Sequence, residues 1–503
     1  MSEIASPTDR GSSAGKNAAL LALLCCVLAA VPFLVVKFPP LTDLPQHVAQ
    51  VRLFGEALAQ PDSPYRIQWI TPYSLVYSVL GAAWLLFGAA DAGRLGILFI
   101  AIFWIILLFW LAYKMKRPAL AAALSVILFF SHILYWGFYQ FVFGWPLFIL
   151  WVILLRTDFS NRRTEVLSFW LASLGLYLTH ILWFAAALGW LVLSHVVFRR
   201  ESRTLVFRLA AAAPFLVLAA IWYPSLSAYG FGSPTFWETA PFERLSPVWL
   251  ADAALGGLKG SFEAVFFAII IAWILAAWLS NRKELPARTD KELLLLAGVF
   301  FALALLLPYK YTNTIRFSSR WVPPALSFLL LGLPRPRVPK NILTAAVAAV
   351  LVAFFALTSL NWVAFEKSEL GGLGESLAAL PAAPRVIGLS YIKESSVVRG
   401  SPFIQVFAYA QVYKGGELNF SFADFGPSLV VYRERRRPPW TNGLEWFPER
   451  AKKTDLGFFD YALISGDERL HASLAADGGL RPATPGGRWR LYKVERAAPQ
   501  GSR

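Results

Sequence analysis

The sequence predicts an α-helical membrane protein that crosses the bilayer about eleven times and carries a small α/β domain after its last span. Composition is the first observation behind this prediction, because the 503 residues are 57% hydrophobic and only 16% charged. Soluble proteins average roughly 45–50% apolar and about 25% charged residues. The second observation is that apolar runs of roughly 20 residues recur along the chain, and each is long enough to span a hydrocarbon core of about 30 Å.

Each of these apolar runs is expected to be a membrane span. Their ranges are 18–36, 94–113, 118–134, 138–155, 166–179, 181–198, 206–223, 262–280, 292–308, 321–333 and 341–360. Lys and Arg gather in the segment before the first span and then in every second connection, as they do in cytoplasmic loops. The apolar segment 73–90 would reverse this pattern if it crossed the membrane. We therefore predict that 73–90 is an interfacial helix within a long outer loop, 37–93.

The net charge of +16 follows from this topology, because most basic residues flank the spans, where they also attract anionic lipid headgroups. We therefore expect no nucleic-acid partner, although a strongly basic soluble protein would suggest one. The two cysteines, Cys25 and Cys26, are adjacent inside the first span, so the sequence offers no disulfide framework.

The domain organisation follows from the same pattern. Residues 1–17 are polar and rich in Ser and Gly, which predicts a disordered cytoplasmic tail. A transmembrane domain extends over 18–360, with a second long outer loop at 224–261, and a linker at 361–380 follows it. Short β-rich runs after the linker predict a small α/β domain at 381–497. The charge pattern predicts a multi-pass protein of the inner cell membrane, with a cytoplasmic N-terminus and an extracytoplasmic C-terminal domain.

Asp43, in the segment PPLTDLPQHVAQ, is an acidic residue that this topology places at the outer membrane face. Carboxylates near the bilayer are costly and usually have a partner or a function. Further along the same loop, TPYSLVYSVLGAAWLLFGAADAGRL leads into a span that starts at Arg94. This order of first span, acidic outer loop, surface helix, many further spans and external C-terminal domain resembles the polytopic C-type (GT-C) glycosyltransferases.

That superfamily includes protein O-mannosyltransferases and lipid A aminoarabinose transferases, which take a sugar from a polyprenyl-phosphate carrier at the outer face. The resemblance is architectural and covers about residues 1–330. It implies a hexosyl- or pentosyltransferase of the cell envelope. The partners it implies are a polyprenyl-phosphate-linked sugar, the lipid bilayer and an extracytoplasmic acceptor, whether glycan, lipid or protein. Relatives often have two adjacent acids, whereas Asp43 is followed by Leu44, so a second acid has no support here.

Asp43 is the candidate general base, because an acceptor hydroxyl needs a carboxylate that removes or polarises its proton. The alternative is that Asp43 only caps a helix, which Pro45 at the first turn favours. His47 follows one helical turn later and is a second catalytic candidate. It could instead orient the acceptor, bind a divalent cation together with Asp43, or hydrogen-bond to the backbone. Two ligands at this spacing leave the metal undetermined, and no other cofactor is expected.

Arg316 and Arg320, in PYKYTNTIRFSSRW, are the candidates for holding the donor phosphate, with Lys310 nearby. They stand at i and i+4 where an outer loop meets a span. Arginine binds phosphate bidentately and stays charged in a low dielectric. The alternative is that these side chains only reach toward lipid headgroups.

The tip SHILYWGFYQF joins two spans by a tight turn and combines polar and aromatic side chains, which can bond to sugar hydroxyls and stack on a sugar ring. The candidates for sugar or acceptor binding are His132, Trp136, Tyr139, Gln140 and, at the next outer turn, His180. An aromatic belt at the membrane interface explains Trp136 and Tyr139 equally well. A packed interfacial histidine is the alternative for His180.

Two other function classes were compared with a glycosyltransferase. A transporter or lipid flippase would have charged residues facing one another at mid-membrane, or paired broken helices from inverted repeats. The predicted spans are almost free of charge, which favours chemistry at one membrane face. A non-catalytic membrane scaffold, whose external domain binds a partner, is the third class. A lipid-sized groove ending at Asp43 would distinguish an enzyme from such a scaffold.

Overall fold

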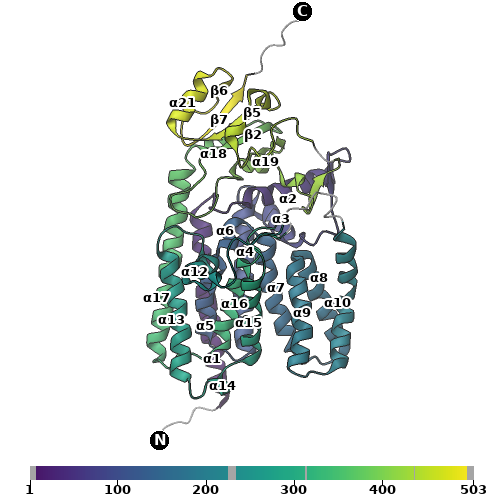
Figure 1. Ribbon diagram of the computed structural model, residues 1–503, viewed down its shortest axis with the longest axis vertical. Coiled ribbons are helices and arrows are strands. Elements are labelled where there is room, and N and C mark those ends of the chain that lie inside the picture. The colour runs from purple at the N-terminus through teal and green to yellow at the C-terminus, as the bar shows by residue number, and fades with distance from the viewer. Residues whose placement is uncertain (1–6, 225–233, 312–313, 435–436, 496–503) are drawn as a thin grey trace, which may run out of the picture. The chain divides into compact units, whose positions relative to one another are not determined.

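The computed structural model of this protein describes residues 7–224, 234–311, 314–434 and 437–495, with side chains from residue 15 onward. The start of the expected tail, 1–6, and the end of the expected C-terminal domain, 496–497, lie outside these ranges. The described chain is mostly helical and forms two compact units (Figure 1). The first unit contains residues 1–34, 97–134 and 138–359, and the second contains 35–96, 135–137 and 360–503.

The first unit is a bundle of helices. In chain order they are α1 (Pro7–Val35), α4 (Ala92–Lys114), α5 (Ala119–Ser125), η1 (Val126–Phe130), α6 (His132–Trp136), α7 (Tyr139–Leu155), α8 (Arg162–Thr179), α9 (Ile181–Val197), α10 (Ser202–Trp222), η2 (Glu243–Leu245), α12 (Pro247–Leu255), α13 (Phe262–Asn281), α14 (Leu285–Arg288), α15 (Lys291–Leu306), η3 (Ser319–Trp321), α16 (Val322–Gly332) and α17 (Lys340–Ala364). Parts of α1, α4, α6 and α17 belong to the second unit.

Helices occupy the positions of all the predicted spans, and the segment 118–134 is formed by α5, η1 and α6 together. Six helical runs among the described residues are long and apolar enough to cross a membrane, and they lie in α1, α4, α5–α6, α10, α13 and α17. α1 begins at Pro7, so helix replaces much of the tail that the sequence predicted as disordered. Extending an existing helix needs no new nucleation, which explains how polar residues can join it.

The segment that was predicted to lie on the outer surface contains α3 (Leu75–Phe87). This helix has 13 residues. At 1.5 Å per residue it is about 20 Å long, which is shorter than a hydrocarbon core of about 30 Å.

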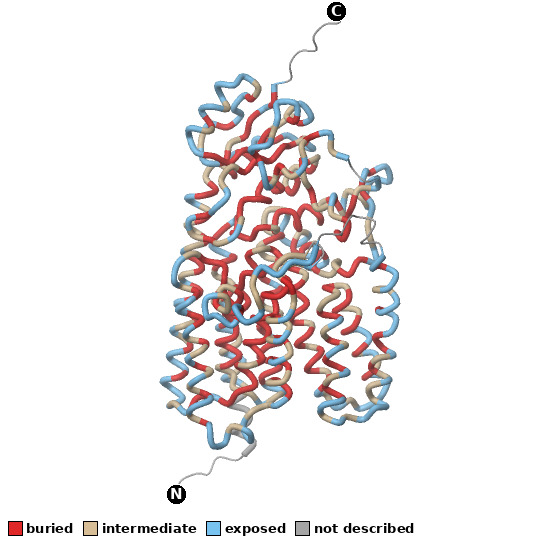
Figure 2. The backbone as a smooth tube through the Cα atoms, viewed as in Figure 1, coloured by how far each residue is buried: buried red, intermediate tan, exposed pale blue. Residues whose placement is uncertain are grey.

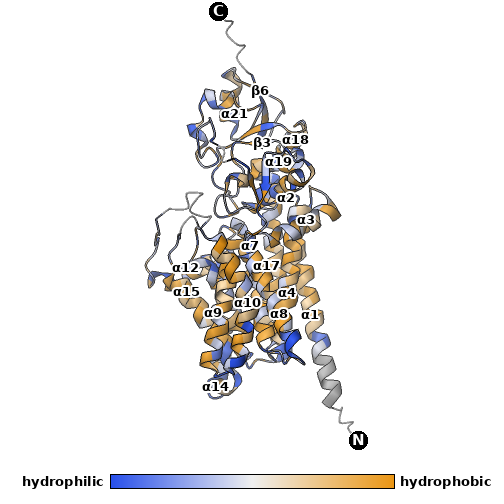
Figure 3. Ribbon diagram, turned by 90° about the vertical axis from the view of Figure 1, so that its right-hand side faces the viewer, coloured by the Kyte–Doolittle hydropathy of each residue, from blue (hydrophilic) through white to orange (hydrophobic). Residues whose placement is uncertain are grey.

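Aromatic rings form part of the core of the first unit. Phe300 stacks on Trp321 with 5.4 Å between ring centroids, and Trp183 and Phe328 pack against the same ring at 5.7 and 5.8 Å. Buried positions concentrate in the middle of the bundle, where α5 and α16 are almost wholly buried (Figure 2). The helices are coloured as hydrophobic over most of their length (Figure 3), and many of their large apolar side chains are exposed. Helices that are apolar all round are typical of a membrane environment.

Charged contacts connect the basic loops at one end of this bundle. Glu292, which is almost fully buried at the start of α15, pairs with Arg156 after α7 and, at 2.7 Å, with Arg200 before α10. Arg117, between α4 and α5, donates to the carbonyl oxygen of Leu331 at 2.7 Å. Basic clusters that the sequence predicted to share the cytoplasmic side therefore lie at a common end of the bundle.

The second unit combines the outer loop 37–93 with the C-terminal part of the chain. Its further elements are α2 (Leu44–Ala59), β1 (Tyr65–Ile67), α3, η4 (Phe365–Glu369), α18 (Leu373–Ala378), β2 (Arg385–Ser390), η5 (Val406–Ala408), α19 (Tyr409–Lys414), β3 (Glu417–Leu418), η6 (Phe422–Asp424), β4 (Val430–Tyr432), η7 (Pro448–Arg450), α20 (Lys453–Leu456), β5 (Tyr461–Ser465), α21 (Glu468–Ala476), β6 (Leu480–Pro482) and β7 (Trp489–Val494).

A five-stranded mixed sheet with the order β3–β2–β5–β7–β6 organises the C-terminal part. β2 is parallel to both β3 and β5, whereas β7 is antiparallel to β5 and β6. Ile387 on β2, Ile464 on β5 and Tyr492 on β7 are buried in one hydrophobic cluster with Phe459 and Leu444. β2 and β5 read as near-continuous apolar strands because the parallel centre of a sheet is covered on both faces.

The outer loop is joined to the C-terminal part by backbone pairing. β1 is antiparallel to β4, with Tyr65 opposite Tyr432. Val430 N donates to Gln50 Oε1 at 2.8 Å, and Gln50 Nε2 donates back to Val430 O at 3.1 Å. Gln46 Nε2 donates to Gln405 Oε1 at 2.9 Å. Because Gln46 and Gln50 are fully buried, these bonds fix the rotation of α2 about its axis.

The segment 361–380, which the sequence predicted as a linker, is helical and packed. It contains the end of α17, η4 and α18. Glu366 Oε1 accepts hydrogen bonds from Lys37 N and Phe38 N, both at 2.8 Å. This carboxylate connects the C-terminal chain to the start of the outer loop, a long-range contact to which local glycine content gives no clue.

We predict that Gln50→Leu lowers the stability of the protein. Leucine has a similar volume, but it leaves the buried N–H and C=O of Val430 without the two bonds described above. An unsatisfied buried polar group costs about 1–3 kcal/mol. We expect a melting temperature several degrees lower in detergent, whereas Gln60→Leu at the exposed end of α2 should change it little. Equal melting temperatures for Gln50→Leu and the natural protein would contradict this role.

Candidate functional site

Asp43 precedes the first residue of α2. Its backbone has φ −91° and ψ 1°, and its side chain makes no capping hydrogen bond. Pro45 stands in the first turn, where the N–H it lacks would have no partner inside the helix. Within the described residues no side chain or backbone group hydrogen-bonds to the Asp43 carboxylate. The helix therefore starts without using this carboxylate, which leaves its oxygens available.

The turn after α6 lies against Asp43. Thr42 N donates to the carbonyl oxygen of Tyr135 at 2.9 Å, and Trp362 Nε1 donates to the Tyr135 hydroxyl at 3.0 Å. Gly137 has a φ of +105°, and a Cβ at this position would lie 2.5 Å from the Cβ of Asp43. Glycine is therefore required at this position both by its backbone conformation and by its distance from Asp43.

The surroundings of Asp43 change its acidity. The side chain is half-buried, and desolvation by the protein raises the pKa of Asp43 to about 7. An ordinary aspartate has a pKa of about 3.9 and is a weak base. A carboxylate with a pKa near neutrality is still substantially ionised at pH 7 and accepts a proton far more readily, which suits a general base.

His47 is fully engaged by its neighbours. Its Nδ1 lies 3.0 Å from the Tyr77 hydroxyl, and the ring also bonds to the backbone of Gly137. Burial lowers the pKa of His47 to about 3, although the bond to Gly137 opposes this shift, so the ring is neutral at pH 7. His47 thus connects α2 and α3 to the turn beside Asp43. No group of three or more His, Cys, Asp or Glu residues in the described ranges could hold a metal ion.

In the first unit, Asp252 on α12 lies between two basic residues. Its Oδ2 is 3.3 Å from Arg316 Nη1, and its Oδ1 is 3.5 Å from His132 Nδ1. The side chain of His132 is 3% exposed, while those of Asp252 and Arg316 are 29% and 20% exposed. A Cβ at Gly256 would lie 2.8 Å from His132 Nδ1, so the end of α12 has to be glycine for the cluster to form. The result is a buried histidine beside an accessible ion pair.

Asp252 is ionised at neutral pH in this cluster. Burial alone would raise its pKa, but the hydrogen bond and charge of His132, together with the charge of Arg316, outweigh burial and lower the pKa of Asp252 to about 2. Our sequence analysis did not single out Asp252. An acid within the apolar run PVWLADAAL was the available signal, because an ionisable residue in such a segment needs a partner.

Arg316 adopts a backbone conformation that is rare for its residue type. Its φ is +51°, in the left-handed region, which costs about 1–2 kcal/mol for a residue other than glycine. Strained backbones of this kind are concentrated at functional sites. The strain directs a partly exposed guanidinium toward Asp252, at the end of the bundle opposite the basic loops.

Arg320 has a different role from Arg316, although the sequence analysis treated them as a pair. It is 1% exposed. Its guanidinium donates to the carbonyl oxygens of Ile315 at 2.7 Å and Arg316 at 3.2 Å. It also lies 4.5 Å from the ring centroid of Phe138 and 5.1 Å from that of Phe141. Arg320 therefore stabilises the turn that presents Arg316.

His180 caps α9. Its Nδ1 accepts a hydrogen bond from Leu182 N at 3.1 Å, and its ring packs edge-on against Phe141 at 5.5 Å. Burial, followed by the charge of Arg320, lowers the pKa of His180 well below its ordinary value. These contacts match the packed histidine that was the alternative reading of this residue.

The remaining sequence candidates are buried or half-buried. Tyr139, at the start of α7, is fully buried. Gln140 and Lys310 are half-buried in the first unit, and the backbone of Lys310 pairs with that of Phe236 at 3.0 Å in both directions. Trp136 is half-buried in the second unit. In the first unit the structure thus brings His132 and Arg316 to the unpredicted Asp252, whereas His180 and Arg320 both pack against Phe141.

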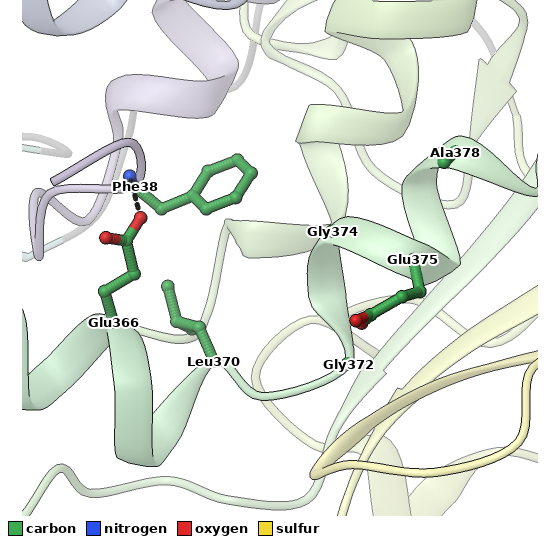
Figure 4. A pocket seen from close by; sticks show the side chains of 7 residues that line it. All are labelled: Phe38, Glu366, Leu370, Gly372, Gly374, Glu375 and Ala378. Carbon is green, nitrogen blue, oxygen red and sulfur yellow. Dashed lines mark hydrogen bonds between the residues drawn. The ribbon is translucent and has the colours of Figure 1, made fainter.

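A separate cavity of about 500 Å³ lies in the second unit (Figure 4). It is lined by Phe38, Glu366, Leu370, Gly372, Gly374, Glu375 and Ala378. One Glu366 oxygen faces the backbone N–H of Phe38 in this view. None of the predicted site residues lines this cavity, so it is not part of the candidate catalytic site.

We predict that Arg316→Gly is more stable than Arg316→Ala by about 1 kcal/mol. Both changes remove the guanidinium and its contact with Asp252, but only alanine retains the cost of a positive φ. Thermal unfolding of the two purified variants measures the difference. If they melt at the same temperature, the backbone at this position is not strained in the way described.

Comparisons of the sequence with known proteins give no match. No protein-family model matches the chain. No curated protein matches it either.

Solved structures do resemble it. Apo ArnT from Cupriavidus metallidurans has a TM-score of 0.52 at 12% identity, over 95% of this chain and 98% of that chain. ArnT from the same organism bound to undecaprenyl phosphate has a TM-score of 0.51 at 13% identity, over 94% and 97%. The arabinofuranosyltransferase AftD from Mycobacteria has a TM-score of 0.51 at 17% identity, over 96% of this chain and 40% of AftD.

At these identities the likeness is one of fold. ArnT and AftD are both GT-C glycosyltransferases. The likeness extends over nearly the whole of this chain, including both compact units, rather than over a few spans. The protein is mostly helical, its fold is similar to that of these GT-C glycosyltransferases, and six helical runs among its described residues are long and apolar enough to cross a membrane.

Proposed function

We propose that this protein transfers a sugar from a polyprenyl-phosphate carrier to a hydroxyl group of an extracytoplasmic acceptor. In this proposal Asp43 is the general base and Arg316 binds the donor phosphate. The observation that carries the proposal is the state of Asp43. Its carboxylate has no hydrogen-bond partner in the described chain, is half-buried, and has a pKa of about 7.

An unpaired carboxylate in a desolvated position destabilises a protein, so its presence calls for a functional reason. Several contacts hold Asp43 in this half-buried position without a hydrogen-bond partner in the described chain. The bonds of Gln46 and Gln50 fix α2, and His47 holds the turn at Gly137 against it. Such support is expected around a group whose position determines a reaction rate.

The step has a defined balance of atoms and electrons. The acceptor oxygen forms a bond to the anomeric carbon of the sugar, and its proton passes to the Asp43 carboxylate. The bond between the anomeric carbon and the phosphate oxygen breaks, and its electron pair leaves with the polyprenyl phosphate. Because this leaving group is already stabilised as an anion, the main requirement is a fixed positive charge for its developing negative charge.

Arg316 meets that requirement better than the other basic candidates. It is partly exposed and carries a planar fork of N–H donors suited to phosphate. Among the residues that the structure describes, Asp252 alone provides a carboxylate within 4 Å of it. Arg320 is buried on backbone oxygens, so we assign it the role of positioning Arg316. Asp252 would hold the guanidinium between turnovers and compete with the phosphate when the product leaves.

The choice of lipid partner follows from the comparisons. One similar structure is ArnT bound to undecaprenyl phosphate, and another is an arabinofuranosyltransferase. We therefore propose a polyprenyl phosphate as the carrier, within the bilayer that surrounds the apolar helices. His132, Trp136, Tyr139, Gln140 and His180 remain proposals for sugar or acceptor contacts, of which the half-buried Trp136 and Gln140 are the most accessible.

We predict that Asp43→Asn lowers kcat by about 10²–10⁴ while the melting temperature stays equal or rises. Asparagine keeps the shape of the side chain but accepts no proton, and it removes a desolvated charge. For the natural protein, kcat/KM should fall as pH decreases through about 7, because the base is active only when ionised. Transfer from undecaprenyl-phosphate-linked pentoses and hexoses in reconstituted vesicles measures both effects.

Asp62→Asn is the matched control, because Asp62 is an exposed acid in the same outer loop. It should leave the rate and the pH profile unchanged. If Asp43→Asn retains full activity, Asp43 is not the base. If the natural protein moves the lipid across the bilayer without transferring sugar, the flippase reading replaces this proposal.

We predict that Arg316→Gln weakens binding of undecaprenyl phosphate by about 10–100-fold, as expected for the loss of a charge-assisted hydrogen bond of about 1.5–3 kcal/mol. Lys310→Gln, which removes a neighbouring charge, should weaken it much less. Fluorescence quenching in nanodiscs measures both affinities, with dioleoylphosphatidic acid as a competitor of different chain chemistry. Equal effects of the two changes would assign the binding to general electrostatic attraction instead of to Arg316.

A further inference from the structure

An apolar groove lies between α8 and α10, at the end of the first unit that carries the basic loops. These two helices pack along their length, with Trp170 against Phe215 at 5.4 Å between ring centroids. A cavity of about 400 Å³ opens at their starts. Its lining is almost entirely apolar apart from two arginines, and consists of Arg162, Arg163, Val166, Leu167, Trp170 and Phe207.

Arginines surround the aromatic wall of this cavity. The guanidinium carbon of Arg162 lies 4.4 Å from the ring centroid of Phe207, and that of Arg203 lies 5.8 Å from it. Arg162 also pairs with Glu165 at 2.7 Å, and Glu165 pairs with the buried Arg208 at 2.9 Å. Glu165 therefore pairs with Arg162 and Arg208, and its pair with Arg208 joins α8 to α10. It does not neutralise Arg163 or Arg203.

Two of the arginines at the cavity remain without a counterion. In the described part of the chain, no carboxylate lies within 4 Å of Arg163 or Arg203, and both are exposed. Neighbouring Arg156 and Arg200 are committed to Glu292. The mouth of the cavity is therefore positively charged, and an anion placed there would meet two available guanidinium groups.

Apolar side chains continue from the cavity along the outer face of both helices. Leu167 and Leu171 on α8 are 57% and 54% exposed, and Val206 on α10 is 63% exposed. In water such a strip would be unfavourable, so it is expected to contact lipid chains. A ligand that fills the whole feature must carry a negative group at one end and a long apolar chain at the other.

We propose that this groove, defined by Arg162, Arg163, Val166, Leu167, Trp170 and Phe207, binds an anionic phospholipid. The phosphate would lie between Arg163 and Arg203, and one acyl chain would run over Phe207, Trp170 and Leu167. A soluble anion would leave the apolar lining uncovered, and a zwitterionic lipid would bring its own cation to a positive site. This site is independent of the proposed glycosyl transfer, because none of its residues belongs to the candidate catalytic site.

The experiment measures lipid binding to the full-length protein in detergent by native mass spectrometry. Phosphatidylglycerol and phosphatidylcholine with identical acyl chains are titrated separately. We expect phosphatidylglycerol to bind at least tenfold more tightly. In Arg163→Gln/Arg203→Gln its affinity should fall by about 30-fold, at the contribution expected for two basic residues near an anionic headgroup. Arg162 is left intact because its pair with Glu165 supports the fold.

The control is Arg282→Gln/Lys283→Gln, which removes the same charge from an exposed loop without an apolar groove. It should keep the affinity for phosphatidylglycerol within about twofold of the natural value. A third arm adds sn-glycerol 1-phosphate, which should not displace the lipid. Melting temperatures show whether each variant is folded. If the double variant unfolds, the single changes Arg163→Gln and Arg203→Gln replace it, each with an expected loss of affinity of about fivefold.

Three results would overturn the proposal. Equal affinity for the two lipids would remove the anionic headgroup from the recognition. An equal loss in the control variant would assign the preference to diffuse surface charge. Displacement by sn-glycerol 1-phosphate would identify a site for soluble anions, because this compound has no acyl chain to contact the apolar lining.

Discussion

The position of α2 depends on hydrogen bonds between residues that lie far apart in the chain. Gln50 and Val430, 380 residues apart, exchange two bonds, and β1 pairs with β4 beside them. Buried glutamines are costly unless every polar atom is paired, so this arrangement permits one orientation of the helix. Asp43 stands directly before α2, and its place beside Gly137 follows from that orientation. The C-terminal part of the second unit thus supports the outer loop through β4 and Gln405.

The candidate site in the first unit depends on a different constraint, which is charge balance at low dielectric. Asp252 on α12, His132 on α6 and Arg316 before η3 lie on three separate segments. The contacts of Asp252 with the other two offset the free-energy cost of desolvating these polar groups. The contacts with His132 and Arg316 lower the pKa of Asp252, and Arg316 keeps a strained backbone because Arg320 bonds to the carbonyl oxygens of that turn. A group that is accessible and strained at the same time is well suited to bind a transient anion, as a departing phosphate would be.

The two ends of the helical bundle in the first unit differ in how far their charged side chains are paired. At the end with the basic loops, Glu292 and Glu165 connect several arginines, and surplus arginines remain exposed beside an apolar groove. At the other end, Asp252 pairs with Arg316 and lies beside the buried His132. Surplus cations suit a permanent association with a lipid surface, whereas a small balanced cluster suits a ligand that binds and leaves.

Much of the architecture could be predicted from the sequence. The apolar runs predicted the positions of the helices, and the spacing of Lys and Arg predicted which loops would gather at one end, since both are local patterns with a direct physical cause. Asp43 also stood out, because an acid beside a membrane span is unusual wherever the chain folds. Its neighbours within one helical turn, including His47, followed from helix geometry.

The sequence by itself thus determined the membrane class of the protein, the order of its helices and the isolated acidic residue. Only the tertiary structure decided which charges pair, that Arg316 is accessible while Arg320 is buried, that Asp252 belongs to the cluster, and that the segment 361–380 is a packed connection. These outcomes arise from contacts between residues hundreds of positions apart. Hydrophobic periodicity and charge spacing are patterns of residues close together in the sequence. The burial and the pKa of a side chain depend instead on which atoms surround it in the folded protein.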